Sequence, residues 1–585
     1  MIRIDDPDTL VVRAANYIQR EHAPTYLALR FLLNTIPEAK RAAWIENFIS
    51  RKIDARVQLS YRRVPVLKSL DGNGKSDFRT FCYGSPTTLL MESWFLSEVS
   101  KLAKFRRHPA VYSYIWPSSL SGRSFQFFLD GYSNRDRAIE RALVSNNDVA
   151  LIADIKNFYP SVSVAAVVEQ FNIAIKESEV SESVKGALSW IVVQLFEKSG
   201  VPGLPVGSNI SHVLANLYLA KLDEKLSQIF PGRYFRYVDD IVIVCPRNES
   251  KKVKELLDDE LGRLNLAANS DKYDVVSRVE WGARDYIQKT SGDEINFGGL
   301  TTALTEYLVL HPEKYSDIQD SLSSAGIYFP LRNIRAVSKY KRYLRYFFGH
   351  GSRIPVGRRF KNIYQTDPQF FLENALRLRT DFYKYRDYLS STVAPTGGMN
   401  RRWWVRAWRY TLSRSLYLYP PDELRMLASN DEVPVELSDI KFMAGTLSGA
   451  HDISQMASFP GRALRATAEL YAERFGAVPN KNVWEGKLSS SLIEGLATLG
   501  VHGLVENRSV RQLAALSEHD QTYLKFSTGA GDDRRSLSDF SYEDEVSCLA
   551  LGFVNADREI LMKERFDERQ DAFFSGLYVG EYDYS

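Results

Sequence analysis

The amino-acid sequence predicts an α+β fold in which a mixed α/β region precedes a large all-α region. Between residues 51 and 300, short apolar runs typical of strands alternate with amphipathic helical patterns. From residue 301 to residue 585 the strand patterns fade and helical periodicity dominates, with a helix-pair array as one arrangement that fits. Residues 1–50 predict a separate helical segment, because the apolar residues of "AANYIQREHAPTYLALRFLLNTI" recur at three- and four-residue spacing with one proline as a break.

Length and composition fit a globular protein of two or three domains. The chain of 585 residues is too long for one ordinary hydrophobic core, and 44% hydrophobic with 25% charged residues is typical of folded domains. A net charge of +3 favours neither nucleic acid nor a membrane as a general partner. Cys82, Cys245 and Cys548 match no metal spacing or disulfide framework, which fits a cytoplasmic location. No apolar run is long enough to predict a membrane span.

The elements of the middle region follow from its apolar patterns. Residues 148–153 form an almost continuous apolar run that predicts a strand, and residues 164–198 have helical periodicity. The glycine- and proline-rich stretch "GVPGLPVGSNIS" predicts a loop. Residues 212–230 and 251–266 predict two amphipathic helices, and a strand–turn–strand pattern over residues 234–245 lies between them.

Two adjacent aspartates interrupt the apolar run "YFRYVDDIVIVC". Like charges this close repel each other, and their removal from water costs free energy. An aspartate pair between β-branched residues suits the tight turn of a hairpin, because aspartate tolerates turn geometry. Another aspartate, Asp154, ends the apolar run of "LIADIKNFYPSV". If the two strands are neighbours, Asp154 converges with Asp239 and Asp240 although it is remote from them in sequence.

Converging carboxylates favour a divalent-metal site. Hard oxygen ligands suit Mg²⁺, which keeps several waters and bridges to substrate phosphates. Two such ions can hold the attacking and leaving oxygens of a phosphoryl displacement. A lone Asp-Asp pair is more often an ordinary turn. The second strand-end aspartate, and the glycine-rich loop between the two strands, favour the metal site over that alternative.

The order of these segments resembles the fingers and palm of reverse transcriptases over residues 51–300. "ADIKNFYPSV" resembles motif A, "GLPVGSNIS" motif B, "YVDD" the YxDD box of motif C, and "LNLAANSDKYDV" motif D, while "INFGGL" fits motif E less well. Upstream, "DFRTFCYGSPTTLLMESWFL" and "SGRSFQFFLDGYSNRDRAI" resemble fingers segments of the same family. The resemblance implies a DNA polymerase, a nucleotidyltransferase that uses dNTPs.

The resemblance implies catalytic roles for three aspartates. Asp154 and Asp239 would ligate two Mg²⁺ ions, or Mn²⁺ as the alternative, with the backbone carbonyl of Ile155 as a further ligand. Asp240 would be the less directly involved member of the catalytic set.

The same resemblance implies four substrate-binding residues. Tyr159 falls where the family keeps a bulky gate against a 2′-hydroxyl, with plain core packing as the alternative. Gly207 permits close backbone approach. Lys272 would lie near the leaving pyrophosphate and protonate it, and Arg79 is a weaker candidate for binding the triphosphate.

Motif B departs from the templated enzymes, most of which have "LPQG" where this chain has "LPVG". Val206 cannot hydrogen-bond a nucleotide or a template base. This departure, together with the helical C-terminal region, resembles the AbiK-like abortive-infection reverse transcriptases of bacteria, in which a helical domain replaces the ordinary thumb. That group implies template-independent, protein-primed DNA synthesis, a single-stranded DNA product attached covalently to the protein, a homo-oligomer, and antiviral defence with a phage trigger.

Two basic segments are candidate nucleic-acid surfaces. Residues 331–363 contain ten Lys or Arg, no Asp or Glu, and interleaved aromatic residues. Cations bind phosphates and aromatic rings stack on bases, so this segment is predicted to guide a single strand. The alternative is a basic helix whose charges meet the acidic stretch of residues 531–585. Residues 400–410, "NRRWWVRAWRY", form the second segment, whose tryptophans are equally compatible with core packing.

Two other functions remain open. A templated RNA-directed DNA polymerase of the retron or group II intron kind would need a dedicated RNA. A non-catalytic relative would keep the fold to bind nucleic acid or a phage protein, although it would have no reason to keep three carboxylates clustered.

Overall fold

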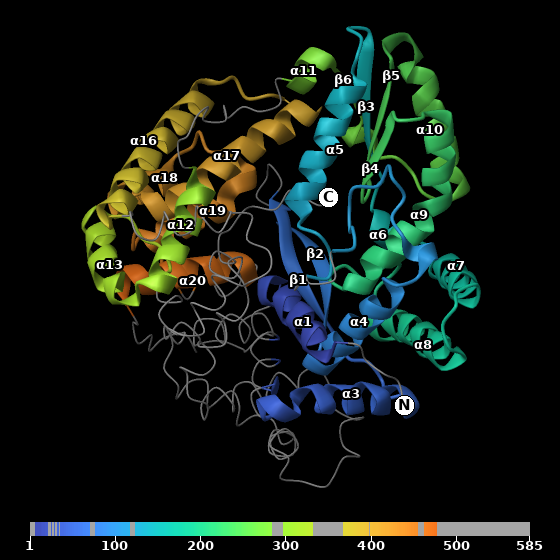
Figure 1. The fold of residues 1–585 in the computed structure, drawn as a ribbon. Coiled ribbons are helices and arrows are strands. Elements are labelled where there is room, and N and C mark those ends of the chain that lie inside the picture. Colours follow the sequence, from blue (N-terminus) through green and yellow to red (C-terminus); the bar gives the residue numbers. More distant parts are fainter. Residues whose placement is uncertain are drawn as a thin grey trace.

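The computed structural model describes residues 6–21, 25, 29, 32–33, 36–70, 76–117, 123–282, 296–331, 367–396, 398–453, 455 and 461–476. These residues form a mixed α/β part with its own core and an all-α part with a second core, as Figure 1 shows. The predicted α+β fold is therefore confirmed.

The N-terminal helices belong to the first core. Helices α1 (Pro7–Glu21) and α3 (Glu38–Asp54) pack against α4 (Pro86–Val99), which is almost wholly buried. Strands β1 (Tyr61–Leu70) and β2 (Ser76–Gly84) form an antiparallel hairpin directly before α4.

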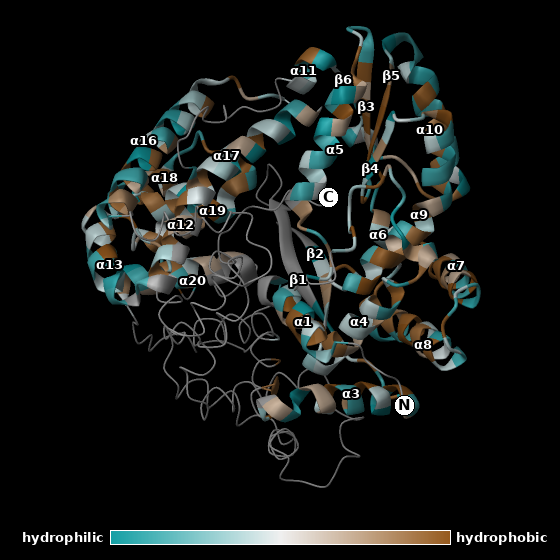
Figure 2. Cartoon of the chain, viewed as in Figure 1, coloured by the Kyte–Doolittle hydropathy of each residue, from teal (hydrophilic) through white to brown (hydrophobic). Residues whose placement is uncertain are grey.

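An antiparallel sheet of order β4-β5-β3-β6 lies at the centre of the α/β part. The strands are β3 (Asp148–Asp154), β4 (Tyr234–Tyr237), β5 (Asp240–Pro246) and β6 (Asp274–Ser277). Every residue of β3 is buried, which explains why its sequence is almost continuously apolar. Figure 2 shows β3 in the hydrophobic colour and helix α10 largely in the hydrophilic colour.

Helices cover both faces of this sheet. The helices in contact with its strands are α5 (Phe128–Ala142), α9 (Asn209–Ile229), α10 (Ser250–Arg263) and α11 (Arg278–Gly282). The α/β part also contains α6 (Phe158–Ser161), α7 (Val164–Lys176) and α8 (Glu182–Ser199), of which α7 packs on α9. The predicted helices over residues 164–198, 212–230 and 251–266 are confirmed, with the first divided into α7 and α8. Serine side chains cap the N-termini of α7, α8 and α9 by accepting backbone N–H bonds.

The second core is entirely helical. It contains α12 (Phe297–Leu310), α13 (Tyr315–Ser324), α16 (Gln369–Ser391), α17 (Gly398–Leu418), α18 (Pro421–Ser429), α19 (Ser438–Leu447) and α20 (Gly461–Phe475). The segment "INFGGL" leads into α12, where Asn296 caps the helix by accepting a bond from the Gly299 N–H. Phe297 is the first residue of this second core along the chain.

Helix α17 joins the two cores. Its residues Trp404 and Trp408 are buried in the second core, whereas Trp403 packs against Trp281 of α11 beside the sheet. The tryptophans of "NRRWWVRAWRY" are therefore core residues. Apart from Leu331, the basic segment of residues 331–363 lies outside the described residues, as does the acidic stretch of residues 531–585. None of the described helices is long and apolar enough to cross a membrane.

Candidate active site

Strand register brings the aspartates together. Asp154, the last residue of β3, lies directly opposite Asp240, the first residue of β5. The backbone N–H of Ile155 donates to the carbonyl of Asp239 at 3.3 Å. Three carboxylates from two remote segments therefore meet at one end of the sheet, as the side-by-side arrangement of the strands predicts.

The hairpin turn that presents Asp239 has a strained backbone. Val238 and Asp239 are the two loop residues between β4 and β5, and Val238 has a φ of 53°. β-Branched residues rarely adopt this left-handed conformation. The turn is held by the Ser113 hydroxyl, which accepts from the Val238 N–H at 3.0 Å, and by Arg236, whose Nη1 donates to the Val238 carbonyl at 2.7 Å.

A buried ion pair fixes Arg236. Its guanidinium donates two bonds to Asp223 of α9, at 2.7 and 2.6 Å, and both side chains are almost completely buried. The Tyr234 hydroxyl donates to the same carboxylate at 2.7 Å. Sequence analysis missed this network, although an arginine inside an otherwise apolar strand is a signal, because a buried charge needs a partner.

The two innermost carboxylates are strongly buried. Asp154 is 2% exposed and Asp239 is 8% exposed. Burial, together with the charges of Asp240 and Asp154, raises the pKa of Asp239 well above its ordinary value. Burial also raises the pKa of Asp154, although Lys272 opposes that shift. A bound cation would offset both penalties.

The available oxygen atoms fit such a cation. Asp154 Oδ1 is buried and has no hydrogen-bond partner. Two backbone bonds form the bridge between Ile155 and Ala268, and neither of them uses the carbonyl of Ile155. Within the described part of the chain, no group of three or more His, Cys, Asp or Glu side chains is arranged around one metal position. The protein groups that fit a cation are therefore the carboxylates of Asp154 and Asp239 and the carbonyl of Ile155. Mg²⁺ accepts such a small set of protein ligands beside water and phosphate.

Asp240 faces different partners. The Tyr132 hydroxyl donates to its Oδ2 at 3.5 Å, and Arg135 Nη1 lies 3.7 Å from the same oxygen. Both partners belong to α5. Asp240 therefore has partners on α5, although its charge also acts on Asp154 and Asp239.

Lys272 lies against the carboxylate of Asp154. Its Nζ is 3.3 Å from Asp154 Oδ2, and its segment is tied to β3 by two backbone bonds, Lys156 N–H to Ala267 and Asn269 N–H to Asp154. Burial lowers the pKa of Lys272 below its ordinary value, with Asp154 opposing the shift. A lysine in this state gives up its proton more readily.

Tyr159 is held by a residue that sequence analysis missed. Its hydroxyl and His212 Nδ1 share a hydrogen bond of 2.7 Å, and the His212 ring stacks on Tyr114 with centroids 3.8 Å apart. Burial lowers the pKa of His212 to about 3, so the imidazole is neutral. Arg79 of β2 is close enough to Tyr159 to interact with it electrostatically. No spacing pattern in the sequence indicates the role of His212.

The motif B loop is docked against β2. Gly207 has a φ of 103°, and a Cβ there would lie 2.9 Å from the Cys82 carbonyl oxygen. The Val206 carbonyl accepts from the Cys82 N–H at 2.6 Å, and the Gly207 carbonyl accepts from the Tyr17 hydroxyl of α1. The close approach that requires glycine is thus made by the Cys82 backbone.

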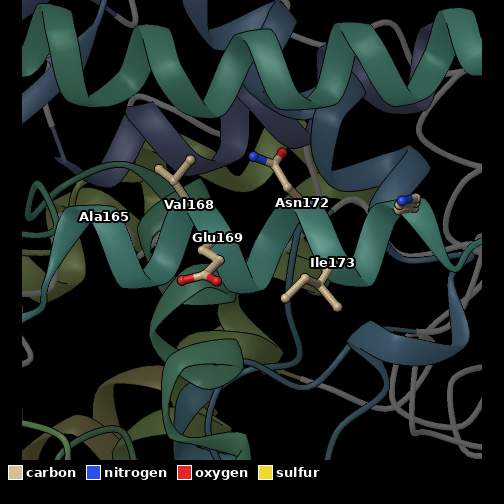
Figure 3. Close-up of a pocket in the computed structure, with 6 residues that line it drawn as sticks. Ala165, Val168, Glu169, Asn172 and Ile173 are labelled. Atoms are coloured by element: carbon tan, nitrogen blue, oxygen red, sulfur yellow. The ribbon is translucent and has the colours of Figure 1, made fainter.

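A separate depression lies along α7. It has a volume of about 460 Å³ and is lined by Ala165, Val168, Glu169, Asn172, Ile173 and Lys176. Figure 3 shows that its lining side chains come from one helix. None of the three aspartates lines it, so it is not part of this site.

A known family model matches the segment that carries the three aspartates. Residues 100–302, which include the three aspartates and Lys272, match the model of "Reverse transcriptase (RNA-dependent DNA polymerase)". No curated protein matches the chain.

Solved structures with similarity to the chain include two telomerases. Telomerase from Candida albicans in complex with a fragment of telomeric RNA is 12% identical, with a TM-score of 0.27, over 69% of this chain and 69% of that one. Apo telomerase from Candida tropicalis is 11% identical, with a TM-score of 0.25, over 81% of this chain and 73% of that one. Scores this low add no argument about the site.

Proposed function

We propose, on the premise that residues 100–302 are a reverse-transcriptase-type nucleotidyltransferase domain, that the chain synthesises DNA from dNTPs without a template. The 3′-hydroxyl of the growing strand, or a hydroxyl of the protein at initiation, attacks the α-phosphate and releases pyrophosphate. The observation that carries this proposal is the meeting of Asp154 and Asp239 around a buried carboxylate oxygen that has no partner.

Metal binding explains why the carboxylates are buried together. Asp154, Asp239 and the Ile155 carbonyl would hold Mg²⁺, or Mn²⁺ as the alternative. When bound, the ions lower the pKa of the attacking hydroxyl and neutralise charge on the leaving pyrophosphate. The protein contributes fixed ligand positions, because the strand register and the Val238 turn hold both aspartates.

Lys272 would supply the proton that pyrophosphate needs as it leaves. Its Nζ lies beside Asp154, and its lowered pKa favours donation of a proton from the ammonium group to a phosphate oxygen. Tyr159, positioned by His212, would exclude a 2′-hydroxyl, and Arg79 would bind the triphosphate from the fingers hairpin.

Two features support synthesis without a template. The Val206 side chain has no hydrogen-bonding group to hold a template base, and its backbone carbonyl already bonds Cys82. Trp403 of α17 packs on the sheet face to which Asp154 and Asp240 belong, so protein covers part of that face and leaves less of it open to a base-paired duplex.

The biological setting rests on the resemblance to the AbiK-like group. It supports antiphage defence, protein priming, a covalently attached single strand, a homo-oligomer, a phage trigger and a cytoplasmic location for this chain.

The test is a polymerisation assay with purified protein, labelled dNTPs and Mg²⁺, followed by denaturing gels run before and after protease treatment. We expect product without added template, and a mobility shift on proteolysis because the strand is joined to protein. Strict dependence on an added template would contradict the proposal.

The description of the matching family favours templated RNA-directed synthesis as the second candidate. Such an enzyme would carry its own RNA. A single RNA species that copurifies with the protein and restores activity after nuclease treatment would establish this alternative.

A further inference from the structure

The C-terminal helical region reaches the sheet face that carries the aspartates. Side chains alternate between faces along a strand, so Asp154 shares a face with Ile152, and Asp240 shares it with Val242. Ile152 and Val242 pack with Trp403 of α17 in one buried cluster. Figure 1 shows α17 extending from the helical part toward α5 and α11.

Specific contacts fix the start of α17 beside the active site. The Met399 N–H donates to Asp274 Oδ2 of β6 at 3.0 Å, and the Trp403 and Trp281 rings meet edge to face with centroids 6.0 Å apart. A Cβ on Gly398 would lie 2.8 Å from the same Asp274 oxygen, so glycine permits this approach. The helix also contacts the short segment Ser270–Lys272.

Along α17, Arg402 lies between Met399 and Trp403, which contact Asp274 and Trp281. It is close enough to Asp154 and Lys272 to interact electrostatically with both. Its Nη1 lies 3.8 Å from Met399 Sδ, and no described carboxylate pairs with it. Its neighbours on α17 differ in this respect, because Arg401 binds Glu436 and Arg409 binds Asp439 within the helical part.

Arg402 and Lys272 are two cations that lie near the same carboxylate, that of Asp154. Arg402 and Lys272 repel each other, and the single Asp154 carboxylate also has to serve as a metal ligand. A polyphosphate supplies several negative oxygens, and the planar guanidinium of arginine can bind two of them at once. The position of Arg402 next to Lys272 therefore matches the phosphate chain of a nucleotide.

We propose that Arg402 binds the triphosphate of the incoming nucleotide, so that the C-terminal helical region supplies part of the nucleotide site. This inference rests on the proposed polymerase function and names a binding residue for it. The phosphodiester of the growing strand offers the same chemistry, and the experiment separates the two sources.

The experiment compares Arg402→Ala and Arg402→Lys with the control Arg401→Ala in the full-length protein. Arg401→Ala removes the same charge from the adjacent position, where the side chain binds Glu436. We expect Arg402→Ala to raise the KM for dNTP about 10- to 100-fold, as for loss of a charged hydrogen bond, with a smaller change in kcat. Arg402→Lys should recover part of the loss, and Arg401→Ala should keep the wild-type KM.

Inorganic tripolyphosphate separates the nucleotide from the strand. It should inhibit the wild-type protein in competition with dNTP, and Arg402→Ala should weaken this inhibition by about the same factor as it raises KM. An unchanged inhibition constant together with weaker binding of a single-stranded oligonucleotide would overturn the assignment to the triphosphate.

Equilibrium binding of dNTP with Ca²⁺ in place of Mg²⁺ separates this inference from the proposed function. If the wild-type protein incorporates no nucleotide, but its dNTP binding is lost in Arg402→Ala and kept in Arg401→Ala, the inference stands and the polymerase proposal fails. If Arg402→Ala binds and incorporates dNTP with wild-type constants, the inference fails and the polymerase proposal stands.

Discussion

At the scale of single residues, the site combines groups that are unfavourable for folding. Asp154 and Asp239 are buried side by side, so each disfavours the charge of the other. Such pairs raise the question of whether they serve chemistry or stability. If they serve chemistry, a neutral replacement should lower activity while it keeps or raises stability.

Asp239→Asn should remove activity without loss of stability. The neutral amide cannot replace a carboxylate ligand, and we expect dNTP incorporation to fall by about a thousandfold or more, since metal stabilisation is worth several kcal/mol. Because the pKa of Asp239 is raised, its neutral replacement should keep or increase the thermal midpoint at pH 8. Asp148→Asn, at the other end of β3, is the control. It breaks an ion pair with Arg233, so it should lower the midpoint and keep incorporation.

The Tyr159–His212 pair should set sugar discrimination. Tyr159→Ala removes the proposed gate, and we expect the ratio of kcat/KM for rNTP over dNTP to rise about 10- to 200-fold, as for other single-group discrimination. His212→Ala keeps the Tyr159 ring but removes the hydrogen-bond partner of the Tyr159 hydroxyl, so the ratio should rise less. His451→Ala, whose ring stacks on Phe442 in the second core, is the matched histidine change and should leave the ratio unchanged.

At the scale of elements, the β4–β5 hairpin depends on a buried ion pair. Arg236→Met leaves the Asp223 charge buried without its partner, which should cost about 3–5 kcal/mol of the free energy of unfolding. Arg236→Met with Asp223→Leu removes both charges and should recover most of that stability. The double variant still lacks the bond to the Val238 carbonyl, so its incorporation rate should stay low. Full recovery of activity would show that the pair does not position the turn.

A buried carboxyl joins α4 to the loop before α9. Glu92 Oε1 accepts from the Tyr61 hydroxyl of β1 at 2.9 Å and from the Ser208 hydroxyl at 2.7 Å. Burial raises the pKa of Glu92 to about 7, above its ordinary value of 4.5. The folded chain therefore holds this proton more tightly than the unfolded chain. Stability supported by the neutral carboxyl is complete below pH 4.5 and is lost as pH rises through about 7.

Glu92→Gln keeps an acceptor for both hydroxyls and removes the titration. We expect urea unfolding to show a decline in stability between about pH 4.5 and pH 7 for the wild-type protein, on the order of 3 kcal/mol at most, and a flatter profile for the variant. Glu98→Gln on the same helix, where the carboxylate pairs with Lys101, is the control. A variant profile as steep as that of the wild-type protein would contradict this origin of the pH dependence.

At the scale of the whole molecule, the helical part is joined to the sheet that carries the three aspartates. Trp403 packs with sheet residues and Trp404 with the second core, although they are adjacent on α17. This arrangement lets a change in the helical part alter the position of Arg402 beside the active site.

The two tryptophans offer a matched test of that connection. Trp403→Ala and Trp404→Ala should each cost about 3–5 kcal/mol, because each leaves a cavity in a core. Only Trp403→Ala loosens α17 from the sheet, so only this variant should raise the KM for dNTP. Equal KM values in the two variants, with similar losses of thermal midpoint, would show that the contact between the parts does not serve nucleotide binding.

The sequence by itself determined the α+β class, the principal helices and strands of the middle region, and the aspartates that meet at the sheet end. These features leave local signals, such as apolar periodicity, a glycine-rich loop and charges inside an apolar run. Only the tertiary structure decided which residues support the site. Strand register and helix packing bring together segments that share no local sequence pattern. Examples are the Arg236–Asp223 pair, the Tyr159–His212 bond and the position of Arg402 near Lys272.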